Sequence, residues 1–112
     1  MILPGVELGL SALSSNTALL PQISPQNKTP LIGKNTEECM LSGALRGAGL
    51  LVDSAVSEMW LQLGERGSLV ITGGCAGYVE PHLKSTLIHC PNLIMDGMFI
   101  IKDRIRHKDK EE

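Results

Sequence analysis

Residues 35–64 constrain the fold of this 112-residue chain more than any other segment, because they predict one long helix. Asn35 can serve as an N-cap that accepts a hydrogen bond from the Glu38 amide, and acidic residues in the first turn suit the helix dipole. Gly64 can end the helix as a C-cap. The apolar residues recur at helical spacing, at Leu41, Ala44, Leu45, Ala48, Leu51, Val52, Ala55, Val56, Met59 and Leu63. We therefore expect a helix over 36–63 with one continuous apolar face.

Two glycines, Gly43 and Gly47, lie one turn apart inside this predicted helix. Each glycine weakens a helix by about 1 kcal/mol relative to alanine. A compensating interaction is therefore expected, and the missing side chains permit the close approach of another helix or of a ligand. Of these two interpretations, the sequence favours helix packing.

The remaining elements are shorter. Residues 1–3 read as the end of a strand, and residues 6–19 as a helix that stops before Pro21. Two short strands are expected, and a last helix, or a strand and turn, follows before a charged tail over 106–112. The two strands span 68–72 and 86–89, and the last element spans 93–105. Two strands alone make a marginal sheet, so we expect residues outside this sequence to complete it.

Composition excludes several classes of protein. A formal net charge of -2 provides no positive field for nucleic acid. Arg46 and Asp53 interrupt the longest apolar stretch, which argues against a membrane span, and the N-terminus has no signal-peptide pattern. The three cysteines are widely spaced and odd in number, which favours free thiols. These features predict a cytoplasmic protein that binds neither nucleic acid nor a membrane.

One motif stands out as a candidate ligand site. The apolar run that begins at Leu69 ends in Thr72, Gly73 and Gly74. Glycines at the carboxyl end of a buried strand allow the backbone to approach a flat ring or a phosphate. An ordinary strand-ending turn would have the same composition, so the residues alone leave both interpretations open. No spacing of Ser, His, Cys or carboxylate residues predicts a catalytic group or a metal site.

Several short motifs occur in an order that resembles the type III pantothenate kinases. They are Pro4-Gly5-Val6, Thr17-Ala18-Leu19-Leu20-Pro21, Ile32-Gly33-Lys34-Asn35-Thr36 with Ser42-Gly43, Val70-Ile71-Thr72-Gly73-Gly74, Cys90-Pro91-Asn92-Leu93 and Asp96-Gly97-Met98. Each motif is weak, whereas the order and spacing are specific and extend over nearly the whole chain. The resemblance implies an α/β fold, the C-terminal half of an actin-like ATPase (ribonuclease H-like) fold, with a small sheet flanked by helices.

The resemblance also implies an activity and a set of site residues. It implies phosphorylation of pantothenate by ATP, the first step of coenzyme A synthesis, with a monovalent cation (potassium or ammonium) and Mg. Thr72, Gly73 and Gly74 correspond to the family's adenosine motif. Thr36 corresponds to a threonine that contacts pantothenate across a dimer interface, although its position alone favours a capping role. The expected homodimer would place the Gly43 and Gly47 face of the long helix at its interface.

Departures from the family pattern are equally informative. The Asp-x-Gly-Asn-Thr phosphate loop, the Gly-x-Asp-Arg segment with the catalytic aspartate and the Asp-x-Gly-Thr phosphate and potassium site are absent from this sequence. We therefore interpret residues 1–105 as the C-terminal domain, with the N-terminal domain as a missing partner and the cation ligands outside the chain. Phosphoryl transfer depends on the absent groups, so the isolated chain should be inactive. A non-catalytic binding or regulatory module, or an inactive truncated fragment, is the alternative.

Overall fold

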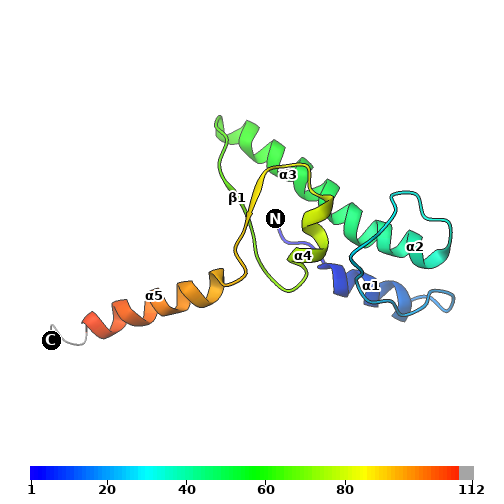
Figure 1. Ribbon diagram of the computed structural model, residues 1–112, viewed down its shortest axis with the longest axis horizontal. Helices are drawn as coiled ribbons and strands as arrows, with labels where there is room; N and C mark the ends of the chain where they lie inside the picture. The colour runs from blue at the N-terminus through cyan, green and yellow to red at the C-terminus, as the bar shows by residue number, and fades with distance from the viewer. Residues whose placement is uncertain (109–112) are drawn as a thin grey trace.

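One long helix organises the computed structural model, which describes residues 1–108 (Figure 1). It runs without a break through α2 (Thr36–Leu41), a π-helical turn η1 (Ser42–Arg46) and α3 (Gly47–Leu63). The predicted helix over 36–63 is confirmed in both its limits. The π-helical turn has no counterpart in the prediction. It lies beside the loop that precedes α2, since the Ser42 hydroxyl donates to the Leu31 carbonyl at 2.7 Å.

The ends of the long helix are capped as the sequence predicts. The Asn35 side-chain oxygen accepts from the Glu38 amide at 2.9 Å. The Glu38 carboxylate in turn accepts from the Lys34 amide at 2.7 Å, so two amides at the helix start are satisfied reciprocally. Gly64 follows the last turn at φ 77°, a conformation that side chains disfavour, and its amide donates to the Trp60 carbonyl.

Removing the N-cap should have a measurable cost. We expect Asn35→Ala to lower the free energy of unfolding by about 1 kcal/mol, because the Glu38 amide loses its acceptor. Urea denaturation followed by circular dichroism measures the change. Asn35→Asp is the matched control, since it keeps the acceptor oxygen and should stay within a few tenths of a kcal/mol of the unmodified chain. Equal losses in the two variants would contradict the capping assignment.

Helix α1 (Val6–Ser15) is shorter than the predicted 6–19. Polar side chains near its C-terminal end donate hydrogen bonds to helix carbonyls. They thereby compete with the backbone amides that would continue the helix by donating to the same carbonyls. The Asn16 side chain donates to the Ala12 carbonyl at 3.0 Å, and the Thr17 hydroxyl donates to the Leu13 carbonyl at 2.6 Å. The prediction relied on apolar spacing and therefore placed the end too late.

The core lies between α1 and the first half of the long helix. It consists of Val6, Leu10, Met40, Leu41, Leu45 and Val79. Leu10 and Leu45 are 1% and 0% exposed. The continuous apolar face predicted for the long helix is only partly buried, because Leu51, Met59 and Leu63 are exposed on α3. Figure 1 shows why: α1 covers only the α2 end of the helix.

The sheet is a parallel pair, β1 (Leu69–Ile71) and β2 (Leu87–His89), in which Leu69 pairs with Leu87 and Ile71 with His89. Both strands were predicted, and the α/β class is confirmed. The crossover contains α4 (Ala76–Val79) and the 3-10 turn η2 (Glu80–His82). Residues 1–3 were predicted as a strand but are irregular, because no strand among the described residues lies beside them to pair with.

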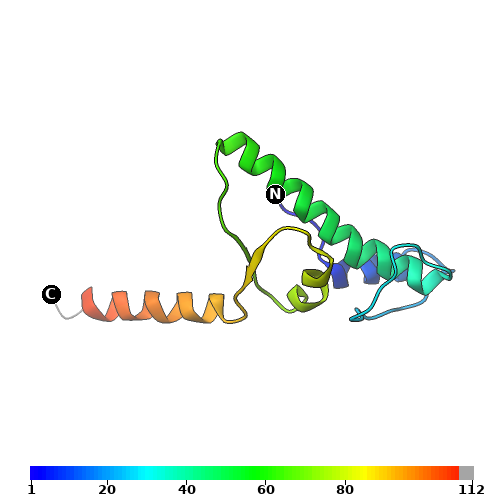
Figure 2. The same cartoon turned by 45° about the horizontal axis from the view of Figure 1, so that its top comes forward.

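Helix α5 (Leu93–Lys108) follows β2 and projects away from the other elements (Figure 1, Figure 2). Residues 93–105 were predicted as either a helix or a strand and turn, and the helix is confirmed. The helix continues through residues 106–108, which were assigned to the charged tail, and residues 109–112 of that tail lie outside the described residues.

The long helix also meets the length and composition expected of a membrane span. Over Thr36–Leu63 the mean hydropathy of the best 18-residue window is 1.3, and 22% of that window is buried. Soluble core helices meet the same criterion, so this is weak evidence. Asp53, near the middle of α3, accepts hydrogen bonds from the Lys84 and Ser85 amides, which ties the helix to the segment before β2. The absence of a membrane span stays a prediction.

Candidate functional site

The glycine motif lies at the carboxyl end of β1, where its backbone is open. Gly73 has φ 106°, and a side-chain carbon built on Gly73 or Gly74 would meet no atom within 4 Å. Thr72 is partly buried, while both glycines are exposed. The Ala76 amide donates to the Gly73 carbonyl at 3.1 Å and turns the chain into α4. A ligand can therefore approach this turn without obstruction from side chains.

A histidine and a carboxylate lie together at the same edge of the sheet. His89 ends β2 opposite Ile71, and its Nδ1 lies 2.7 Å from the Glu80 carboxylate. Neither residue of this pair was among the predicted site residues. The parallel register would have revealed it, because pairing two strands that end at residues 71 and 89 places His89 beside the turn after β1. The carboxylate orients the imidazole next to the candidate ligand site.

Thr36 lies far from this edge. It is the first residue of α2 and is exposed, and the N-cap is Asn35. In both views the start of α2 is at the end of the long helix that points away from β1 (Figure 1, Figure 2). One copy of the chain therefore does not bring Thr36 together with Thr72, Gly73 and Gly74. The roles of all four residues stay predictions.

An apolar groove runs along the junction of α1 with the first half of the long helix and has a volume of about 710 Å³. Gly9 of α1 lines it together with Gly43 and Gly47. A side-chain carbon on any of the three would meet nothing within 4 Å. Packing inside the described chain therefore does not explain Gly43 and Gly47.

The close approach occurs at another glycine. A side-chain carbon on Gly49 would lie 2.6 Å from the His82 carbonyl oxygen, so α3 and η2 touch through bare backbone. Burial lowers the pKa of His82, and the nearby Arg46 charge lowers that pKa further. The His82 Nε2 atom is buried without a hydrogen-bond partner among the described residues. His82 therefore serves the packing of η2 as a neutral side chain.

Asp53 and Cys75 are the other described residues whose side-chain pKa is shifted. Hydrogen bonding to Ser85, first through its side chain, holds the pKa of Asp53 below its usual value despite some burial. Its two oxygens accept from the Lys84 amide at 2.8 Å and the Ser85 amide at 3.0 Å. Burial, and then the charge of Glu7, raises the pKa of the Cys75 thiol. Cys75 is therefore an unreactive thiol at neutral pH.

Metal ligands do not gather in the part of the chain that the structure describes. No group of three or more His, Cys, Asp or Glu side chains within residues 1–108 is placed to hold a metal ion. The cysteines Cys39, Cys75 and Cys90 are free thiols. The side chains of the described residues therefore do not form a metal-binding cluster of this kind.

The chain is thus an α/β protein in which a strand ends in an open glycine turn and a helical crossover leads to its parallel neighbour. A family model described as Type III pantothenate kinase matches residues 1–58. The chain belongs to the type III pantothenate kinase family.

Curated relatives agree with this family. The Type III pantothenate kinase of Desulfotalea psychrophila is 35% identical in an alignment 113 positions long that covers 96% of this chain and 42% of the relative. The Type III pantothenate kinase of Moorella thermoacetica is 32% identical over 103 residues, which cover 92% of this chain and 41% of the relative. The chain thus spans about 42% of the length of the relatives it matches.

Proposed function

We propose that this chain takes part in the ATP-dependent phosphorylation of pantothenate to 4'-phosphopantothenate in the cytoplasm, the first step of coenzyme A synthesis. Family membership supports the reaction class. The observation that carries the proposal is the unobstructed turn at Gly73 and Gly74 after β1, against which we propose that the adenosine of ATP lies. Thr36 supplies a hydroxyl to pantothenate from the exposed start of α2.

The residues present in this chain determine which parts of the active site we assign to it. Residues 1–105 act as the C-terminal domain of an actin-like fold. The bare backbone of Gly73 and Gly74 lets a flat ring lie against the sheet edge, and the Thr36 hydroxyl donates to or accepts from a polar group of pantothenate. ATP supplies the phosphoryl group. The phosphate loop, the catalytic aspartate and the cation ligands come from residues outside this chain, since those motifs are absent from it.

Reconstitution tests the proposal. The chain is mixed with the part of the Desulfotalea psychrophila relative that lies outside the aligned region, and ATP-dependent phosphorylation of pantothenate is measured. Activity is expected from the mixture and not from either part alone. Thr36→Ala should raise the KM for pantothenate about tenfold, equivalent to the loss of about 1.4 kcal/mol of binding. An inactive complex that is nevertheless folded would favour a binding or regulatory module instead.

The open groove provides a further prediction about assembly. We propose that the Gly43 and Gly47 face packs against a second copy, which would also bring Thr36 of one copy toward the strand-end site of the other. Gly47→Leu should weaken dimerisation about tenfold, because its side chain would fill the groove where a helix backbone approaches. Sedimentation equilibrium measures the change, with Gly77→Leu, at an exposed position of α4, as the control. Unchanged dimer affinity in Gly47→Leu would refute the interface.

A further inference from the structure

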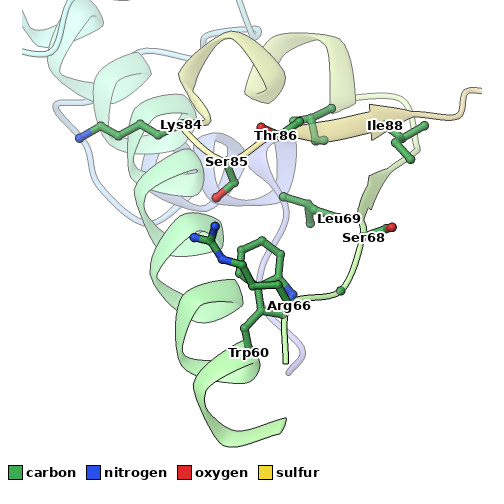
Figure 3. A pocket seen from close by; sticks show the side chains of 10 residues that line it. Trp60, Arg66, Ser68, Leu69, Lys84, Ser85, Thr86 and Ile88 are labelled. Carbon is green, nitrogen blue, oxygen red and sulfur yellow. The ribbon is translucent and has the colours of Figure 1, made fainter. Parts of the chain in front are cut away.

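A second hollow lies at the opposite end of the sheet from the glycine turn. The amino ends of β1 and β2, the end of α3 and the loop between α3 and β1 enclose a volume of about 580 Å³, within the range of small-molecule sites. Its lining includes Trp60, Arg66, Leu69, Ser85 and Ile88 (Figure 3). We call it the Trp60–Arg66 pocket. The strand-end turn at residues 72–74 does not line it, so the two sites are separate.

The charge of this pocket is positive. The Arg66 guanidinium carbon lies 5.2 Å from the centre of the Trp60 ring, a cation–π contact that fixes its position. Among residues 1–108 no carboxylate lies within 4.0 Å of Arg66. Asp and Glu are absent from the lining, and Glu65 lines a different, shallower hollow beside Trp60. The guanidinium therefore offers its hydrogen-bond donors to an anion.

The opposite wall is held in place by Asp53. Its carboxylate accepts from the Lys84 and Ser85 amides, which fixes the segment leading into β2. In Figure 3 the Ser85 hydroxyl points toward Arg66, and Leu69 points toward the Trp60 ring, while the Lys84 side chain extends away. Leu69 and Leu87 are paired across the two strands, so their side chains face the same side of the sheet and add apolar surface to the pocket. The pocket thus combines one fixed cation with an apolar wall of two strands.

We propose that the Trp60–Arg66 pocket binds a planar aromatic anion, such as a nucleoside monophosphate, at a site distinct from the strand-end turn. The anion pairs with the Arg66 guanidinium, which can contact a phosphate or carboxylate through two nitrogens. The ring lies against Leu69 and Leu87, where it gains dispersion contacts and leaves water. Both parts of the ligand are needed, because the wall is apolar and a single exposed cation holds a lone anion weakly.

The single tryptophan of the chain makes the test specific. The indole N–H of Trp60 gives one resonance in a ¹H–¹⁵N NMR spectrum, and AMP is titrated against the full chain. AMP should shift this resonance with a Kd below about 1 mM. Adenosine, which lacks the anion, and inorganic phosphate, which lacks the ring, should each bind at least about tenfold more weakly. An unmoved resonance, or equal binding of phosphate alone, would overturn the proposal.

Matched variants separate this pocket from the strand-end site. Arg66→Gln should weaken AMP binding about tenfold, whereas Arg104→Gln, on the projecting helix α5, should leave it unchanged. Gly74→Val should also leave the Trp60 response unchanged, because Gly74 lies at the other end of β1. Arg66→Gln is expected to fold, since a surface cation–π contact contributes only about 0.5–1 kcal/mol. Equal AMP affinity in Arg66→Gln, or loss of the response in Gly74→Val, would contradict the assignment.

Discussion

Replacing Gly49 with valine should lower the free energy of unfolding by about 3 kcal/mol, the upper end of the usual cost of overpacking. The first side-chain carbon would lie 2.6 Å from the His82 carbonyl oxygen and 3.0 Å from the His82 carbonyl carbon. These are backbone atoms, so no rotamer change relieves the contact, and η2 must move away from α3. The better helix propensity of valine offsets only about 0.4 kcal/mol.

Gly43→Val is the matched control for this prediction. It lies in the same long helix, and a side-chain carbon there would meet nothing within 4 Å. We expect a change within about 0.5 kcal/mol, measured by urea denaturation at a protein concentration where the chain is monomeric. If the two variants were equally stable, the contact between Gly49 and His82 would not hold η2 in place.

The sequence predicted the elements whose signals are local. Asn35, Glu38 and Gly64 are short-range capping residues, and each performs its predicted role because the hydrogen bonds involved span only three or four residues. The two strands were found for the same reason, since each is a short apolar run between turn residues. Their parallel pairing depends on the path of the crossover through α4 and η2. Apolar spacing does not specify that path.

The errors arise where a tertiary contact or a competing local bond decides the outcome. Sequence reasoning singled out Gly43 and Gly47 by their helical spacing, but within the long helix the glycine that touches another backbone is Gly49. No rule of spacing distinguishes these three, because only the path of η2 determines which glycine it meets. Apolar spacing likewise predicted an apolar face along the whole long helix. Helix α1 is long enough to cover only the first half of that face.

The candidate site was predicted in part. The strand-end turn at Gly73 and Gly74 was identified from composition, and the structure shows its backbone open to a ligand. The Glu80 and His89 pair and the Trp60–Arg66 pocket were missed, because each joins residues from elements that only the parallel register and the return of β2 bring together. A single chain also leaves Thr36 remote, so its predicted role depends on a second copy.

The strand-end assignment makes the strongest prediction about activity. In the reconstituted enzyme, Gly74→Val should raise the KM for ATP about a hundredfold, or about 2.7 kcal/mol, because its side chain would occupy the space where the proposal places adenosine. The fold should tolerate this change, since a side-chain carbon at Gly74 meets nothing within 4 Å and only Gly73, at φ 106°, requires a conformation that disfavours side chains. Gly77→Val, three residues further on and equally unobstructed, is the control and should keep the original KM. If both variants phosphorylated pantothenate with unaltered KM for ATP, the nucleotide would not lie against this turn.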